Sequence, residues 1–138
     1  TVGAIALDKN GNLAAATSTG GMTNKMAGRI GDSPIIGSGT YADNDSVAVS
    51  CTGTGDIYMR VNAAHEVSAL YKYKTSDVQK AAEEAVKEVA ALGGSGGIIS
   101  IDKYGKTGFV WTKDKLGMYH GEARLGAKPV VYWPLGEK

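Results

Sequence analysis

Residues 1–21 read TVGAIALDKNGNLAAATSTGG, in which two runs of apolar and small residues, 2–7 and 13–19, flank the polar segment DKNGN. An Asn-Gly pair between two β-prone runs is typical of a tight β-hairpin. Antiparallel pairing would bring the end of the second run back to Thr1. Thr17 and Thr19 are two residues apart and therefore share one face of a strand, but the pattern does not decide which of them faces Thr1.

The first residue, Thr1, offers a nucleophile and a base on adjacent carbon atoms. The hydroxyl group of an amino-terminal threonine can attack a carbonyl, and a free α-amine ordinarily loses its proton near neutral to mildly alkaline pH. Because the sequence opens on threonine rather than methionine, we expect that it was cut, or chosen, to begin there. Taken alone, Thr1 is most simply explained as the start of a fragment, so the case for a catalytic role depends on the remaining sequence.

The composition is that of one globular domain. The 138 residues are 43% hydrophobic and 21% charged, which is enough apolar material for a core, so we expect residues 1–138 to form a single domain. The 15 Lys and Arg residues and 14 Asp and Glu residues give a formal charge of +1. This balance, without runs of like charge, excludes an electrostatic surface for nucleic acid or an anionic membrane and favours a small neutral or zwitterionic partner.

Cysteine and histidine usage argues against a disulfide and against a zinc site. Cys51 is the single cysteine, and His65 and His120 are far apart in the sequence, so we expect neither an internal disulfide nor a zinc ligand set. A lone cysteine favours a reducing compartment, and we expect a cytoplasmic protein. No apolar run approaches the roughly 18 residues that a membrane-spanning helix needs.

A glycine-rich loop at residues 28–33, GRIGDS, carries Arg29 and Asp32 and has neither helical nor strand periodicity. A guanidinium group can hold a carboxylate with two parallel hydrogen bonds, and a carboxylate can bind an ammonium group. The pair would therefore suit the two charged groups of an amino acid. The alternative is a surface turn that happens to carry two charges, and the spacing alone does not separate these interpretations.

A second glycine motif, TGTGD at residues 52–56, stands between a predicted strand at 46–51 and a predicted helix. The order strand, glycine turn and helix invites the dinucleotide pattern GxGxxG, but Tyr58 occupies the third glycine position. Backbone N–H groups at a helix start can also bind an oxyanion. The apolar positions of the predicted helix are Ile57, Val61, Ala64, Val67 and Tyr71.

The remaining periodicity predicts an α+β fold. Ser76 begins a second helix as its N-cap, Gln79 completes a capping box, and the apolar stripe of this helix runs from Val78 to Leu92. Strands, then two helices, then strands correspond to an antiparallel sheet covered by helices. We expect further extended segments at residues 34–41, 98–102, 108–112, 118–122 and 130–133.

Three blocks of sequence, TVGAIALDKNGNLAAATSTGG, GRIGDSPIIGSGTYAD and SCTGTGD, resemble at these spacings the β chain of plant-type L-asparaginase/isoaspartyl aminopeptidase, an N-terminal-nucleophile hydrolase. The resemblance is dense over residues 1 to about 60, and the later GGSGG and GMY motifs are also similar, whereas residues 113–138 depart from the pattern. It implies a four-layer αββα sandwich of which this chain supplies about half. It also implies a precursor that cleaves itself before Thr1 into α and β chains, which stay together as an (αβ)2 assembly.

The resemblance also implies a reaction and the residues that perform it. Thr1 would be the nucleophile with its own amine as base, and Thr19 would position the Thr1 hydroxyl. Thr52 and Gly53 would form the oxyanion hole. The reaction would be hydrolysis of the side-chain amide of L-asparagine, or of an N-terminal β-aspartyl (isoaspartyl) peptide, through a β-aspartyl ester on Thr1.

Substrate binding and cofactors follow from the same resemblance. Arg29 would bind the α-carboxylate of the substrate, Asp32 would bind its α-ammonium group, and Gly55 would contact the bound amino acid. The reaction needs no cofactor, and the structural sodium ion that the resemblance implies would lie in the α chain rather than in these residues.

Other activities compete with this interpretation. Glycosylasparaginase, which hydrolyses N4-(β-N-acetylglucosaminyl)-asparagine, shares the threonine nucleophile and a similar loop, but it is a lysosomal enzyme with disulfides and tends toward TSTNG where this sequence has TSTGG. A taspase-like endopeptidase is more distant. A non-enzymatic alternative is an amino-acid-binding domain in which Arg29 and Asp32 hold the ligand and Thr1 does nothing.

Overall fold

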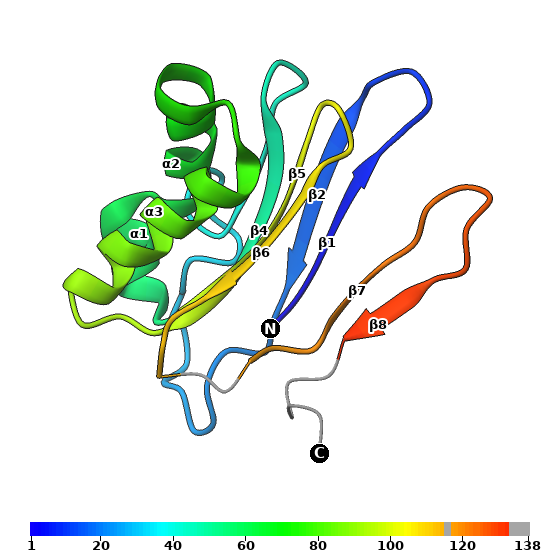
Figure 1. The fold of residues 1–138 in the computed structure, drawn as a ribbon. Helices are drawn as coiled ribbons and strands as arrows, with labels where there is room; N and C mark the ends of the chain where they lie inside the picture. The colour runs from blue at the N-terminus through cyan, green and yellow to red at the C-terminus, as the bar shows by residue number, and fades with distance from the viewer. Residues whose placement is uncertain (115–116, 133–138) are drawn as a thin grey trace.

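The computed structural model describes residues 1–114 and 117–132 (Figure 1). Its elements follow the order that the sequence predicts: strands come first, helices lie in the middle, and strands follow again. Their bounds are β1 Val2–Leu7, β2 Leu13–Ser18, β3 Thr40–Ala42, β4 Val47–Gly53, α1 Gly55–Val61, α2 Ala63–Leu70, the π-helical turn η1 Tyr71–Thr75, α3 Val78–Ala91, β5 Gly96–Asp102, β6 Thr107–Trp111, β7 His120–Glu122 and β8 Val130–Tyr132.

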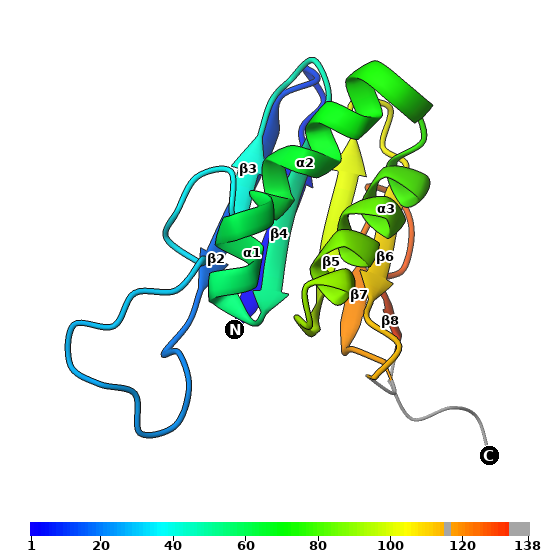
Figure 2. The same cartoon turned by 90° about the vertical axis from the view of Figure 1, so that its left-hand side faces the viewer.

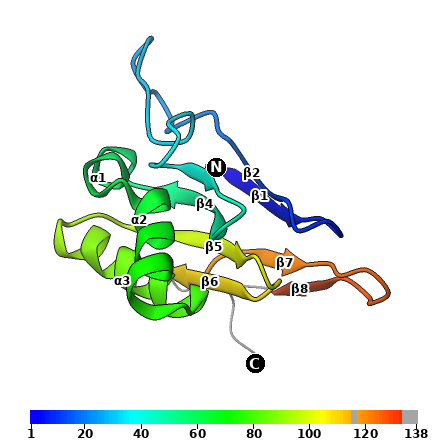
Figure 3. The ribbon, with the colours of Figure 1, turned by 90° about the horizontal axis from the view of Figure 1, so that it is seen from above.

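A 4-stranded antiparallel sheet of order β3-β4-β5-β6 forms the centre of the molecule. All helices cover one of its faces, and the β1–β2 and β7–β8 hairpins lie on the other (Figures 2 and 3). Strand β4 extends beyond the predicted 46–51 and includes Gly53, which pairs with Gly96 of β5. This arrangement confirms the predicted α+β class, with helices on an antiparallel sheet.

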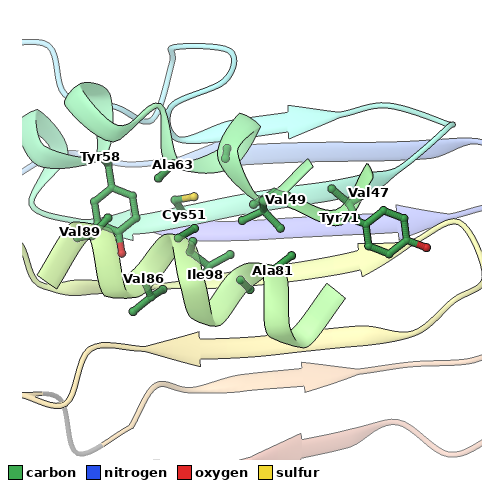
Figure 4. Packing of buried hydrophobic residues seen from close by; sticks show 14 of the residues in the cluster. Val47, Val49, Cys51, Tyr58, Ala63, Tyr71, Ala81, Val86, Val89 and Ile98 are labelled. Atoms are coloured by element: carbon green, nitrogen blue, oxygen red, sulfur yellow. The ribbon is translucent and has the colours of Figure 1, made fainter. Parts of the chain in front are cut away.

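The core lies between the helices and the central sheet (Figure 4). Alternate residues of β4, Val47, Val49 and Cys51, are buried there against helix residues such as Tyr58 and Val89. Full burial of one such valine contributes roughly 1.5 to 3 kcal/mol to stability. The intervening residues of β4 face the opposite way, toward the β1–β2 hairpin, because side chains alternate along a strand.

The predicted hairpin is confirmed. Strands β1 and β2 pair antiparallel with Val2 opposite Ser18 and Leu7 opposite Leu13. Asp8 stabilises the turn because its Oδ1 accepts hydrogen bonds from the N–H groups of Asn10 and Asn12, both at 2.8 Å. The hairpin packs on β4 and β5, so that Thr1 lies over the end of the central sheet where β4 ends (Figure 1).

The predicted first helix, from Ile57 to Tyr71, is broken in the structure. Asn62 adopts a left-handed conformation with φ of 55°, which ends α1 and precedes α2. The N–H groups of Ala64 and His65 donate to the carbonyls of Ser38 and Gly37, at 3.1 and 2.8 Å, instead of to a preceding helical turn. The break is therefore a tertiary effect that helical periodicity does not reveal.

The predicted capping box at Ser76 is wrong. Ser76 has φ of 51° and ends the π-helical turn, and the N-cap of α3 is Asp77, whose Oδ1 accepts from the N–H groups of Gln79 and Lys80. The Gln79 side chain instead accepts a hydrogen bond from Phe109 N–H at 3.1 Å. The apolar stripe of α3 is buried from Val78 to Val89, but Leu92 is 46% exposed.

The predicted extended segment at 34–41 is also wrong over most of its length. Residues 32–39 form tight turns, with the N–H of Ile35 donating to the Asp32 carbonyl, and only the short strand β3 follows. Near the C-terminus β7 is shorter than the predicted 118–122, whereas β8 agrees with the predicted strand over Val130–Tyr132, and Trp133 lies outside the described residues. Among the described helices, none has the length and apolar character that crossing a membrane requires.

Candidate active site

The Thr1 hydroxyl meets the hydroxyl of Thr19 at the open end of the hairpin. Their oxygens are 2.9 Å apart, and the N–H of Gly21 donates to Thr19 Oγ1 at 3.0 Å. The Thr19 oxygen therefore accepts a bond from Gly21 and makes a second hydrogen bond with the Thr1 hydroxyl, in which either oxygen can be the donor. Thr17 turns to Ser50 and Gly39 instead, so the structure resolves which of the two threonines faces Thr1.

A cavity of about 520 Å³ opens beside Thr1 and gathers every residue that the sequence analysis singled out for the site. These residues come from the hairpin, from the loop that follows it and from the end of β4. They are Thr1, Thr19, Arg29, Asp32, Thr52, Gly53 and Gly55. The cavity wall also includes Ser95 and Met118, which sequence reasoning did not assign although it noted the GGSGG and GMY motifs that contain them.

The end of β4 is held tightly against the start of β5. Gly53 has φ of 152°, and a Cβ at this position would collide with the carbonyl oxygen of Ser95. The N–H of Thr54 donates to the same carbonyl at 2.8 Å, and Thr54 Oγ1 accepts from Ser95 N–H at 3.1 Å. Only glycine fits at position 53, and its backbone is fixed at the edge of the cavity.

Asp32 presents a buried carboxylate to the cavity. The residue is only 5% exposed, and its Oδ2 has no hydrogen-bond partner among the described residues. Burial raises the pKa of the Asp32 carboxyl, and the positive charge of Arg29 offsets part of this effect. A Cβ at Gly55 would lie 2.8 Å from Asp32 Oδ1, so the carboxylate rests directly on the Gly55 backbone.

Arg29 lies on the same loop, and its guanidinium group lies next to the backbone of Gly21 and Gly31. An ideal Cβ at Gly31 or Gly21 would lie 3.1 or 3.3 Å from Arg29 Nη1, so side chains at these positions would crowd it. Within residues 1–114 and 117–132 no ion pair of Arg29 with a carboxylate is formed. A cationic fork and a buried carboxylate therefore both border one cavity, as recognition of a zwitterion requires.

Other reactive groups near the site are shielded. Burial raises the pKa of the Cys51 thiol well above its ordinary value, so this cysteine stays neutral and is not a nucleophile. Burial likewise raises the pKa of the Tyr58 hydroxyl. No group of three His, Cys, Asp or Glu side chains in the described part of the chain could hold a metal ion.

Comparison with known proteins identifies the family of this chain. The sequence model of the asparaginase family matches residues 1–128. The chain is 53% identical over 132 residues to the isoaspartyl peptidase of Escherichia coli, covering 95% of this chain and 40% of that protein. It is 52% identical over 121 residues to a putative isoaspartyl peptidase/L-asparaginase of Dictyostelium discoideum, covering 88% and 34%. It is 45% identical over 117 residues to the isoaspartyl peptidase/L-asparaginase of Bos taurus, covering 84% and 38%.

Enzymes whose nucleophile is the first residue of a chain form the superfamily of N-terminal-nucleophile hydrolases. The chain belongs to the asparaginase family of that superfamily. It spans about two fifths or less of the length of these curated relatives.

Proposed function

We propose that this chain is the catalytic β chain of an amidohydrolase that cleaves the side-chain amide of L-asparagine and N-terminal β-aspartyl peptides. The observation that carries the proposal is the Thr1 hydroxyl, 2.9 Å from that of Thr19 and bordering the same cavity as Arg29 and Asp32. The names of the relatives, isoaspartyl peptidase and L-asparaginase, support the same substrates.

The substrate is held by its two α-substituents. Arg29 binds the α-carboxylate with its guanidinium fork, and Asp32 binds the α-ammonium group, while the backbone of Gly55 contacts the bound amino acid. The Oδ2 of the buried Asp32 has no hydrogen-bond partner in the part of the chain that the structure describes, and this supports the role, because a buried carboxylate is stabilised when a cation binds it. The side-chain amide of the substrate then extends toward Thr1.

The chemistry proceeds in two halves on Thr1. Its neutral amine accepts the hydroxyl proton while Oγ1 attacks the amide carbon, and the oxyanion is stabilised by Thr52 and by the backbone N–H of Gly53. The proton passes to the leaving nitrogen, which departs as ammonia or as the amine of a peptide, and a β-aspartyl ester on Thr1 remains. Water then attacks the ester, giving aspartate and restoring the hydroxyl. Thr19 holds Oγ1 in place throughout.

A partner chain completes the fold. In the described residues β1 pairs only with β2, β7 pairs only with β8, and Val2 on the open edge is 71% exposed. Cavities of about 490 and 540 Å³ lie between the hairpins and the inner face of β5 and β6. We assign this space to an α chain cleaved from the same precursor, in an αββα sandwich of which residues 1–138 supply the catalytic half. Two such pairs form the (αβ)2 assembly.

The remaining properties follow from the resemblance to plant-type asparaginases. Asparaginase-family enzymes generally act without a cofactor, and we assign the implied structural sodium ion to the α chain. The single, buried and unpaired Cys51 supports a cytoplasmic location.

A glycosylasparaginase remains the alternative activity, and an amino-acid-binding domain the non-enzymatic one. The assay that separates them uses the complete protein that contains this chain, incubated with L-asparagine, a β-aspartyl dipeptide or N4-(β-N-acetylglucosaminyl)-asparagine, with aspartate measured by chromatography. We expect aspartate from the first two substrates and none from the Thr1→Ala variant. Turnover of the glycosylated substrate alone would favour glycosylasparaginase, and binding of asparagine without turnover would favour the binding domain.

A further inference from the structure

We propose that Thr17 and Ser50 are positioning residues, whose hydroxyl pair sets the distance between the Thr1 nucleophile and the backbone of Thr52 and Gly53. This inference rests on the proposed function, since it concerns the same reaction. Neither residue borders the cavity that contains Arg29 and Asp32, and Ser50 lines the neighbouring cavity of about 490 Å³, which Thr1 and Thr52 also border. We therefore assign the pair an effect on turnover through the residues that border the first cavity.

The two hydroxyl groups and the Gly39 carbonyl form a short chain of hydrogen bonds in which each donor can be assigned. The oxygens of Thr17 and Ser50 lie 2.6 Å apart, and Thr17 Oγ1 donates to the carbonyl of Gly39 at 3.1 Å. A hydroxyl group has one proton to donate. Thr17 uses its proton on Gly39, so Ser50 must donate to Thr17. Ser50 is 3% exposed, so loss of the Thr17 hydroxyl would take away the partner of a buried hydroxyl, whereas loss of the Ser50 hydroxyl would leave Thr17 held only by the Gly39 carbonyl.

Strand register places this pair two residues along the strands from Thr1, Thr19 and Thr52. Thr17 lies opposite Gly3, two residues from Thr1 on one strand and two from Thr19 on the other. Ser50 lies two residues before Thr52 on β4. Residues two apart on a strand share a face and are separated by about 7 Å. The Thr17–Ser50 pair therefore lies about 7 Å along the strands from Thr1, Thr19 and Thr52, which border one cavity.

The two layers need such a pair because the apolar contacts between them are weakly directional. Hydrophobic contact between small side chains does not by itself fix how one sheet sits on another. A second set of hydrogen bonds between the layers lies at the opposite end of the hairpin, where Asn44 Oδ1 accepts from Leu13 N–H at 2.7 Å and Asn44 Nδ2 donates to Asn12 Oδ1 at 3.2 Å. Thr17 and Ser50 supply the anchor near Thr1.

Gly3 allows the hairpin to approach closely enough for this contact. A Cβ on Gly3 would collide with Ser50 Oγ and would lie 2.7 Å from Ser50 Cβ. The carbonyl of Gly39 that receives the Thr17 proton also accepts from the N–H of Cys51 at 2.9 Å. The pair thus joins the hairpin, β4 and the turn that follows Asp32 at one point.

The test measures kcat and KM of Ser50→Ala, Thr17→Val and Thr17→Ser in the complete protein. We expect Ser50→Ala and Thr17→Val to lower kcat roughly tenfold to a hundredfold, because small misplacements of reacting groups are costly, with KM within about threefold of wild type. Thr17→Ser keeps the hydroxyl and should recover kcat to within about threefold. Unchanged kcat in Ser50→Ala and Thr17→Val would overturn the proposal.

Ser46→Ala is the matched control. The Ser46 and Ser68 hydroxyl oxygens are 2.7 Å apart and buried on the helix side of the sheet, so this variant loses the same kind of hydrogen bond away from Thr1. We expect it to lose similar stability and keep its kcat. An equal loss of kcat in Ser46→Ala would mean that general destabilisation, rather than positioning, explains the effect.

A crystal structure of Ser50→Ala separates this inference from the proposed function. We expect the distance from Thr1 Oγ1 to Gly53 N to change by more than about 0.5 Å. If the wild-type protein hydrolyses none of the substrates, the proposed function fails, and the structure still decides about positioning. An unchanged distance from Thr1 Oγ1 to Gly53 N in the Ser50→Ala crystal would refute the positioning role of Thr17 and Ser50.

Discussion

The hydroxyl oxygens of Thr1 and Thr19 lie 2.9 Å apart although the residues are separated by a whole hairpin. The contact exists because the antiparallel register places the end of β2 beside the start of β1. Thr19 Oγ1 also accepts a hydrogen bond from the Gly21 N–H, which holds the Thr19 side chain in place next to Thr1. The hairpin is thus the element that brings together Thr1, the proposed nucleophile, and Thr19, its proposed positioning group.

Thr19→Val should therefore lower kcat while leaving KM nearly unchanged. The substitution keeps the size and branching of the side chain but removes the hydrogen bond to Thr1 Oγ1, a loss of roughly 1 to 3 kcal/mol in transition-state stabilisation. Thr19→Ser should retain most of the activity. Steady-state kinetics with L-asparagine checks both variants, and a large rise in KM with unchanged kcat would show that Thr19 binds substrate instead.

Arg29→Lys tests the carboxylate grip. Lysine keeps the positive charge but lacks the planar fork, so we expect kcat/KM to fall by the equivalent of roughly 1.5 to 3 kcal/mol, with little change in thermal stability. Arg60→Lys, the same substitution on the exposed side of α1, is the matched control and should behave like wild type. Unchanged kcat/KM in Arg29→Lys would remove Arg29 from the site.

The raised pKa of Asp32 predicts an acid limb in the pH profile. Its carboxyl must be ionised to bind an ammonium group, and burial shifts its protonation to higher pH than in an exposed aspartate. Turnover also needs the neutral Thr1 amine, whose protonation gives an acid limb of its own, so the readout is binding of L-aspartate rather than turnover. As the pH falls, the affinity for L-aspartate should decline above the ordinary aspartate pKa of about 3.9. An affinity that stays constant down to that value would contradict this account.

The Asp32→Asn variant separates binding from folding. The pKa of Asp32 is higher in the folded protein than in the unfolded chain, so the folded protein favours the protonated carboxyl. At neutral pH the carboxyl is ionised in both states, and burying this charge lowers the free energy of unfolding. We therefore expect Asp32→Asn to be at least as stable as wild type at neutral pH, while substrate binding is largely lost. Thermal unfolding and kinetics of one preparation measure both effects.

Local chemistry explains which parts of the fold were predictable. The hairpin depends on the Asn-Gly turn and on its flanking runs, all within residues 2–19, and its prediction is confirmed. The choice between Thr17 and Thr19 depends on Ser50, far along the sequence, and no local pattern contains it. The break at Asn62 likewise arises because the Gly37 and Ser38 carbonyls capture the first N–H groups of α2.

The candidate site was predictable by a different route. Arg29 and Asp32 suggested an amino-acid ligand by their chemistry, but joining them to Thr1 and Gly53 depended on the resemblance, because their loop has no periodicity. The predicted N-cap of α3, Ser76, is wrong by one residue, because the structure has Asp77 at this position. Both are good capping residues, and the choice of Asp77 depends on a π-helical turn that ends at Ser76. No pattern in the sequence signalled that turn.

The open edge of β1 leads to a prediction about isolated chains. Val2–Leu7 pairs on one side only within the described residues, and an unpaired strand edge promotes association with other chains. We expect residues 1–138 produced alone to aggregate or to be inactive, and activity to appear when the sequence is produced as part of its precursor. Size-exclusion chromatography and the asparagine assay check this. A monomeric and active isolated chain would contradict the two-chain proposal.

Thr1 should form a covalent intermediate that can be trapped. If Oγ1 attacks the side-chain carbonyl and the α-amine of the same residue accepts the proton, rapid acid quenching during turnover of asparagine should leave a β-aspartyl group on the peptide that begins at Thr1. Acetylation of that amine should abolish turnover although the hydroxyl remains, whereas Thr1→Ser should keep partial activity. Mass spectrometry of the quenched peptides locates the label. A label on another residue, or normal turnover by acetylated enzyme, would refute the proposed mechanism.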